Sequence, residues 1–278
     1  MTLLEAFQHA QTLGLERLDV QILLLHAHHR PLHDRAWLAL HHHDPLATHL
    51  SEVFNQHLLR RLQGEPVAYI TGQKEFYGLT LQVDARVLVP RPDTETLVDW
   101  TLEVITPLSQ AHVADLGTGS GAVALAIKHM RPDCQVFAVD YSNDALAVAQ
   151  ANAAALQLDI AFIQGSWLSG ISHRFHAIVS NPPYIAAQDP HLLALQHEPL
   201  QALSSGNDGL DDIRTIIRQA PAHLQNNGWL LLEHGYDQAQ AVRQLLREAN
   251  FSQVQSRCDL AGIERCTAGC RHSDDVVD

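Results

Sequence analysis

The chain has 278 residues and a formal net charge of −13, so without a local basic patch it is poorly suited to grip a phosphate backbone, and no basic run is present. Apolar residues make up 46% of the chain, which is enough for a sizeable core and excludes a disordered protein. Because no signal peptide, no run of roughly 20 apolar residues and no disulfide framework is recognisable, we expect a soluble cytoplasmic protein that does not contact membranes.

Residues 1–65 are predicted to form a small helical bundle. Apolar residues recur at helical spacing in two stretches: Leu15, Leu18, Ile22 and Leu25, then Leu50, Phe54, Leu58 and Leu62. Pro31 and Asp44-Pro45 interrupt the pattern. The sequence alone leaves open whether this bundle is a scaffold or a module that docks a partner.

Residues 66–90 are predicted to form a β-hairpin that links the bundle to the rest of the chain. Tyr77-Gly78 lies between Glu75-Phe76 and the alternating run 79–83, as a turn between two strands would. A helix is expected to begin near Asp93, with Thr94 and Glu95 in its first turn.

Strand and helix patterns alternate from Ala111 onward, which predicts an α/β domain over residues 91–278 with a mainly parallel sheet covered on both faces. The expected strands are 112–116, 135–140, 159–163, 175–180, 227–233, 251–257 and 263–270. The expected helices include 142–156 and 236–248. Cys266 and Cys270 lie four apart on one expected strand, roughly 13 Å from each other, so no metal site is predicted there. The tail from Ser273 to Asp278 is expected to fray.

A glycine-rich loop, Gly117-Thr118-Gly119-Ser120-Gly121, ends the strand 112–116 and opens a helix. Its G-x-G-x-G spacing differs from the G-x-G-x-x-G of dinucleotide-binding proteins. Asp115 stands just before the loop, where a carboxylate would repel a pyrophosphate but suit the ammonium and sulfonium groups of S-adenosyl-L-methionine. The loop therefore favours this cofactor over a dinucleotide.

Asp140 ends the next apolar strand, at the distance from the loop where a carboxylate can accept both ribose hydroxyls of an adenosine. The following helix is expected to start near Asn143, which puts Tyr141 and Ser142 near the adenine.

The motif Asn181-Pro182-Pro183-Tyr184 follows the expected strand 175–180, at the end of the sheet where ligands bind. An amide nitrogen is a poor nucleophile because its lone pair is delocalised. Acceptors for both of its N–H groups, the Asn181 side-chain carbonyl and the Pro182 backbone carbonyl, would return electron density to it. The prolines stiffen this geometry and Tyr184 offers a flat face to a planar substrate. The motif predicts methyl transfer to a planar amide or amine nitrogen.

These motifs together resemble the HemK/PrmC family of peptide chain release factor N5-glutamine methyltransferases. Other matching segments include Glu65–Gly72, Val89–Glu95, Glu198–Leu200, Gly209-Leu210, Leu231–Gly235 and Asp259–Arg265. The resemblance implies a class I S-adenosylmethionine-dependent methyltransferase with a Rossmann-like seven-stranded sheet, a small N-terminal helical domain and a β-hairpin linker. The cofactor-binding residues would be Gly117, Thr118, Gly119, Ser120, Gly121, Asp140, Trp167 and Asn181.

The same resemblance implies the substrate: the glutamine of the Gly-Gly-Gln motif of class 1 release factors, held by the residues Asn181 to Tyr184. The helices 1–65 would dock the release factor, the Arg91–Glu95 segment would help close the cofactor site, and the enzyme is expected to act as a monomer. The sequence departs from the family at Ser166, where an acid commonly precedes Trp167, which puts the adenine contact in doubt. Trp167 itself can be a stacking residue or a core residue.

Three other functions remain open. A glutamine of a ribosomal protein could be the substrate, although the Arg91–Glu95 stretch favours the release factor. A nucleic-acid amino group has the right geometry, but the acidic balance counts against it. A binding module without catalysis would be expected to lose Asn181 or a loop glycine, and both are intact.

Overall fold

The computed structural model describes residues 1–272, so the expected fraying of Ser273–Asp278 lies outside the described residues. The chain divides into two compact units, one of residues Met1–Gln73 and one that begins at Lys74. Within residues 1–272, no helix is long and apolar enough to cross a membrane.

The first unit is helical and consists of α1 (Leu3–Thr12), α2 (Arg17–Ala27), α3 (Arg35–His41), α4 (Thr48–Leu62) and α5 (Val67–Thr71). Thr2 starts α1 as a capping box: its hydroxyl accepts from Glu5 N, and its own N–H donates to Glu5 Oε2 at 2.8 Å. The core of this unit forms where α2 packs against α1, α3, α4 and α5.

The buried face of α2 differs from the stripe that the sequence suggested. Leu25 is fully buried, but Leu18 is 44% exposed and Leu15 precedes the helix. The buried residues of α2 are Val20, Leu23, Leu24, Leu25 and Ala27, and of these only Leu25 belongs to the expected stripe. Two overlapping apolar stripes satisfy helical spacing in this segment, and spacing alone does not choose between them.

Three histidines of the helical unit, His26, His28 and His57, are partly buried. The rings of His26 and His57 are 4.9 Å apart between centroids, and two buried nitrogens, His28 Nε2 and His57 Nδ1, have no hydrogen-bond partner among the described residues. Burial lowers the pKa of His26, His28 and His57, and nearby positive charges, Arg60 among them for His26 and His57, lower it further.

We expect the helical unit to lose stability as the pH falls below about 6.5, the pKa of histidine in an unfolded chain. Above that pH the three histidines are neutral in both states; below it the unfolded chain takes up protons that the folded unit resists. Segment-resolved hydrogen exchange, corrected for the intrinsic rate, should show peptides of α2 and α4 losing protection between about pH 7.5 and 5.5. His57→Gln should weaken this loss, and the exposed control His9→Gln should keep it; equal loss in both variants would contradict the assignment.

The second unit holds a seven-stranded sheet in the order β5-β4-β3-β6-β7-β9-β8. Its strands are β3 (His112–Leu116), β4 (Gln135–Asp140), β5 (Ala161–Gln164), β6 (Phe175–Ser180), β7 (Leu224–Glu233), β8 (Phe251–Cys258) and β9 (Glu264–Arg271). β3 to β7 are parallel, and β9 runs antiparallel to both of its neighbours. This confirms the predicted α/β methyltransferase fold.

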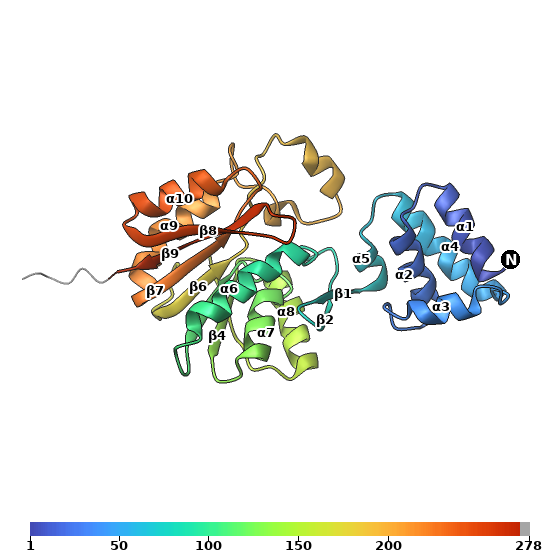
Figure 1. The fold of residues 1–278 in the computed structure, drawn as a ribbon, viewed down its shortest axis with the longest axis horizontal. Helices are drawn as coiled ribbons and strands as arrows, with labels where there is room; N and C mark the ends of the chain where they lie inside the picture. Colours follow the sequence, from blue (N-terminus) through green and yellow to red (C-terminus); the bar gives the residue numbers. More distant parts are fainter. Residues whose placement is uncertain (273–278) are drawn as a thin grey trace, which may run out of the picture. The chain divides into compact units, whose positions relative to one another are not determined.

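Helices cover both faces of the sheet (Figure 1). One face packs against α6 (Glu95–Ile105), α7 (Ala122–Met130) and α8 (Asn143–Leu156), and the other against α9 (Asp211–His223) and α10 (Ala239–Glu248). Three short 3₁₀ helices complete the unit: η1 (Pro92–Thr94), η2 (Pro190–Leu195) and η3 (Leu200–Ala202). The helix expected near Asp93 is thus a 3₁₀ turn that continues into α6.

β7 begins three residues earlier than expected. The pairing between β6 and β7 is irregular here: Phe175 lies opposite Leu224, whereas Ala177 lies opposite Trp229. The intervening polar residues Gln225, Asn226 and Asn227 give no strand pattern, which explains why the sequence placed the start of the strand after them.

The segment 66–90, expected as a linker, is divided between the two units. Residues up to Gln73 belong to the helical unit and include α5, which begins directly after Pro66. The hairpin of β1 (Gln73–Phe76) and β2 (Leu79–Gln82) contributes three buried side chains, Phe76, Leu79 and Leu81, to the core of the sheet unit. Their alternation makes one apolar face, and burial of that face anchors the hairpin to the sheet unit.

Candidate active site

A cavity of ≈ 340 Å³ lies at the carboxyl ends of β3, β4 and β6. This volume falls within the roughly 300–1,000 Å³ of typical small-molecule sites. Residues from every expected cofactor motif line it: Gly117, Gly119, Asp140, Tyr141, Ser142, Ser166, Trp167, Asn181 and Pro183, together with Arg86, Val87, Leu88, Ala145, Gly165, Pro199, Gln201, Ala202 and Asp212.

The glycine loop turns sharply at the floor of this cavity. Gly117, Gly119 and Gly121 all have positive φ, at 70°, 55° and 85°. A Cβ on Gly117 would lie 3.2 Å from the Trp167 ring, and one on Gly121 would lie 3.0 Å from Leu125. The loop therefore requires glycine both for its backbone conformation and for close packing.

Asp115 has a different role from the one its position suggested. Its side chain is buried beneath the loop and is absent from the cavity lining. It accepts hydrogen bonds from Thr118 Oγ1 at 2.6 Å and from Ala124 N at 3.1 Å. Burial raises its pKa to about 7, although these hydrogen bonds oppose the rise. Asp115 thus ties the loop to the start of α7 and does not face a ligand.

Asp140 reaches the cavity. One carboxylate oxygen accepts from Gly119 N and the other from Ser142 N, both at 2.9 Å. Burial raises the pKa of Asp140, and these backbone N–H groups lower it. The carboxylate is held between the glycine loop and the start of α8, where it can accept further hydrogen bonds from a ligand.

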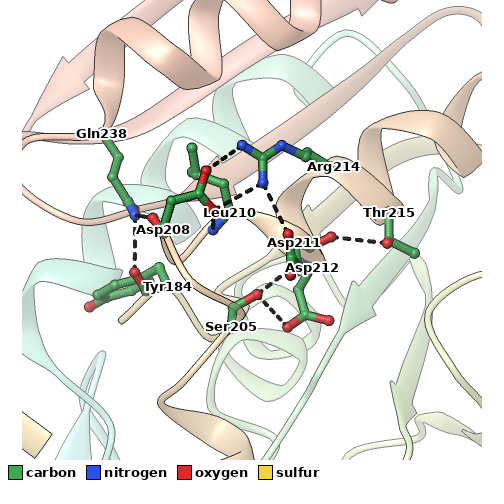
Figure 2. Close-up of polar contacts among 9 residues, drawn as sticks. All are labelled: Tyr184, Ser205, Asp208, Leu210, Asp211, Asp212, Arg214, Thr215 and Gln238. Atoms are coloured by element: carbon green, nitrogen blue, oxygen red, sulfur yellow. Dashed lines mark hydrogen bonds and ion pairs between the residues drawn. The ribbon is translucent and has the colours of Figure 1, made fainter. Parts of the chain in front are cut away.

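Trp167 and Asp212 form a pair at the cavity wall. Trp167 has a left-handed backbone, with φ 54°, and its indole N–H donates to Asp212 Oδ1 at 3.2 Å. Ser205 Oγ donates to Asp212 Oδ2 and in turn accepts from Asp212 N (Figure 2). The expected acid next to Trp167 is missing at Ser166, but α9 supplies a carboxylate to the same cavity.

Asn181 lies where the large cavity meets a second hollow of ≈ 70 Å³. Leu88 and Ala202 also line both hollows, and the smaller one is completed by Arg91, Tyr184, Ile185, Leu195 and Leu203. The Asn181 side-chain amide donates from Nδ2 to Thr94 Oγ1 at 3.1 Å. The side chain therefore stands between a cofactor-sized space and a smaller space that a single side chain could fill.

An ion pair between a partly exposed arginine and a buried glutamate braces the rim of the small hollow. Arg91 binds Glu198 Oε1 at 2.5 Å, and Glu198 Oε2 accepts from Val89 N at 3.0 Å. Glu198 is only 7% exposed. Two motif segments more than a hundred residues apart in sequence thus meet at this rim.

The backbone after Asn181 is held by residues of the loops that lead into α9 and α10. Gln238 donates from Nε2 to the carbonyls of Tyr184 and Asp208 (Figure 2). Gly209, with φ 75°, packs so closely that a Cβ there would lie 2.1 Å from the Tyr184 carbonyl oxygen. Burial raises the pKa of Tyr184, so its hydroxyl stays neutral at physiological pH. The motif is therefore a fixed wall.

The structure brings together most of the residues expected at the site. Gly117, Gly119, Asp140, Trp167, Asn181 and Pro183 line the large cavity, and Tyr184 lines the small hollow. Thr118, Ser120, Gly121 and Pro182 are absent from both linings; Thr118 and Ser120 are buried and support the loop from behind. Sequence reasoning missed Asp212, Glu233 and Asn152. Buried Asn152 bonds Ser120 O and Gln82, and a polar residue within the apolar stretch of α8 was its only signal.

Two family models match the chain. "Methyltransferase small domain" matches residues 94–206 and "PrmC N-terminal domain" matches residues 4–72. Similar proteins named "Release factor glutamine methyltransferase" include one from Xylella fastidiosa (strain Temecula1 / ATCC 700964), 47% identical over 94% of this chain and 95% of its own. Another, from Pseudomonas aeruginosa, is 46% identical over 91% of this chain and 92% of its own.

Solved structures share the fold at low sequence identity. The catalytic domain of hMettl16 is 15% identical with a TM-score of 0.59, covering 83% of each chain. A methyltransferase from Pyrococcus furiosus is also 15% identical, with a TM-score of 0.55, and the match covers 79% of this chain and all of that one.

Proposed function

The chain belongs to the release factor glutamine methyltransferase family, and from that premise we propose that it methylates the side-chain amide nitrogen of a glutamine in a release factor, using S-adenosyl-L-methionine. The observation that carries the proposal is the pair of adjoining hollows that share Asn181. One has the size and polar groups for a cofactor, and the other has the size for one side chain.

The large cavity fits S-adenosyl-L-methionine on several grounds. Asp140 presents a fixed carboxylate to the ribose hydroxyls, and Gly117 and Gly119 let the ligand approach the backbone. Tyr141, Ser142, Ser166 and Trp167 surround the place expected for the adenine, and Asp212 adds a carboxylate that can accept from an amine. When bound, the cofactor supplies an electrophilic methyl group on its sulfonium.

The chain's own residues prepare the nitrogen. Asn181 Oδ1 and the Pro182 carbonyl would each accept one N–H of the substrate amide, which returns electron density to the nitrogen and fixes its direction. Both hydrogen bonds strengthen as the nitrogen becomes positive and its protons become acidic. Tyr184 offers the amide a flat face, and the small volume of the hollow would leave little room for water beside a bound side chain. A strong general base is not needed for this chemistry.

We infer three further properties: which glutamine is methylated, what the N-terminal helices do, and where the enzyme acts. The glutamine is that of the Gly-Gly-Gln motif of a class 1 release factor, because its two glycines would let the substrate backbone come close to a narrow hollow. The helical bundle of residues 1–65, which lies within the helical unit, serves to dock the release factor. The enzyme acts in the cytoplasm as a monomer, and its net charge of −13 makes nucleic acid an unsuitable partner.

The proposal is tested with cofactor labelled in its methyl group. Full-length enzyme is offered a purified release factor, the same factor with the motif glutamine changed to glutamate, a ribosomal protein and duplex DNA. We expect label only in the first, and peptide mass spectrometry should place it on the motif glutamine. Label in ribosomal protein or DNA, with none in the release factor, would overturn the proposal.

A further inference from the structure

A buried carboxyl that none of the proposed steps uses lies beside the amide-binding motif. β6 and β7 run parallel with Ser180 opposite Leu232, so Asn181 and Glu233 leave the sheet together at its carboxyl edge. β9 flanks Glu233 on the other side, where it pairs with Cys266. The position is internal to the sheet, where an acidic side chain is costly unless it is needed.

Glu233 is buried among polar and charged side chains that shift its pKa. The residue is 1% exposed, and its Oε2 has no hydrogen-bond partner among the described residues. Burial raises the pKa of Glu233 to about 7; the hydroxyl of Thr94 and the amide of Asn181 lower it, Asp93 raises it and Arg265 lowers it. Thr94 and Asn181 are thus the neutral polar side chains that stabilise its charged form.

Thr94 connects the two ends of this cluster. Thr94 is 4% exposed, and its Oγ1 accepts from Asn181 Nδ2 at 3.1 Å. A hydroxyl has one proton to donate and lone pairs to accept with. An ionised Glu233 can only accept, and the Thr94 hydroxyl lowers its pKa. If the Thr94 proton is directed to this carboxylate, the Thr94 lone pairs are left for Asn181 Nδ2.

The direction of these hydrogen bonds decides which end of the Asn181 amide faces the hollows. With Nδ2 turned toward Thr94, Oδ1 is the end left for a substrate N–H. A flipped amide would present N–H donors to the N–H donors of the substrate, and the nitrogen would lose its acceptor.

We infer that Glu233 is a positioning residue that acts through Thr94 to hold the Asn181 amide with its oxygen toward the substrate. This inference rests on the proposed function and extends it by two residues, Thr94 and Glu233, that line neither hollow. Of these three side chains only Asn181 would touch the substrate amide; Thr94 and Glu233 would set its orientation.

Protonation of Glu233 would change the orientation of the Asn181 amide. A protonated Glu233 can donate to Thr94 Oγ1, and the hydroxyl is then no longer obliged to accept from Asn181. Turnover should therefore fall as the pH drops through about 7. The charged and titratable groups facing Glu233 are Asp93 from η1, Arg265 and Cys266 from β9, and Tyr184 after β6; Arg265 Nε lies 3.7 Å from Asp93 Oδ2.

The test measures kcat, KM for the release factor and Kd for the cofactor in full-length variants. Thr94→Val keeps the shape but removes the hydroxyl and should lower kcat about tenfold, with cofactor Kd within about threefold. Thr94→Ser should recover most of that loss. Glu233→Gln cannot ionise and should lower kcat similarly and flatten its pH dependence between about pH 6 and 8. Thr101→Val is the matched control, because the hydroxyl of buried Thr101 donates to Leu97 O of its own helix and, within residues 1–272, lies outside the cluster of Thr94, Asn181 and Glu233.

Thr94→Val and Glu233→Gln combined should lose no more than either alone, because both break one chain of hydrogen bonds. Wild-type kcat and pH dependence in both single variants would overturn the inference while leaving release factor methylation by the natural enzyme intact. A fall in kcat matched by equal losses of cofactor affinity and melting temperature would also overturn it, since a structural role would suffice. Absence of methylation by the natural enzyme would instead count against the proposed function.

Discussion

Replacing Asn181 with alanine should lower the turnover of release factor methylation by about a hundredfold or more while the cofactor still binds. The variant removes the side-chain carbonyl that would accept from the substrate amide, and the Pro182 carbonyl alone would leave one of the two N–H groups of the planar amide without an acceptor. Cofactor affinity should change by less than about tenfold, because Asn181 is one of many groups lining the large cavity.

Single-turnover assays with labelled cofactor and calorimetric titration with S-adenosylhomocysteine separate these two effects. The exposed Asn226 on β7 provides the control: Asn226→Ala should retain full turnover. If Asn181→Ala methylates the release factor at the natural rate, the amide-binding role assigned to Asn181 is incorrect.

Asp140→Asn should weaken cofactor binding by about a hundredfold, the loss expected when charged hydrogen bonds to two ribose hydroxyls disappear. The effect has a second source in the protein itself. Both Asp140 oxygens accept from backbone N–H groups, those of Gly119 and Ser142, and an amide can accept with only one of its two ends. The glycine loop therefore loses part of its support as well.

Calorimetry gives the cofactor Kd, and the melting temperature without cofactor reports the loss of loop support. The surface residue Asp159 offers a matched control, since Asp159→Asn removes an exposed carboxylate that does not line the cavity. A natural Kd in Asp140→Asn would exclude Asp140 as the ribose-binding residue.

The sequence predicted best those features that lie within one strand and its following loop. The glycine loop, Asp140 and Asn181 each stand at the end of an apolar strand, and parallel strands bring their carboxyl ends to one edge. Local spacing was therefore enough to gather them at one cavity. The same reasoning placed Asp115 at the ligand, whereas its carboxylate bonds to the loop and to α7. Position along the chain does not say whether a carboxylate points at a ligand or into the loop behind it.

The spacing of residues along the chain could not predict which side chains from distant elements reach the site. Asp212 reaches the cavity from α9, and its role depends on Trp167, which lies 45 residues earlier. Thr94 and Asn181 are 87 residues apart, and Glu233 comes from yet another element, β7. Their meeting depends on the order of strands in the sheet, which alternating hydrophobicity does not specify. Glu233 was visible in the sequence only as a family-like residue without a role.

The placement of β9 has a consequence for how the protein is made. This last described strand lies between β7 and β8. The edge of β7 opposite β6 therefore has no partner strand until the segment up to Arg271 has left the ribosome. Glu233 and its neighbours remain solvated until then. A nascent chain, or one cut short by a nonsense codon before Glu264, would therefore lack the strand that pairs with Glu233, and we expect it to be unable to bury this residue beside Asn181.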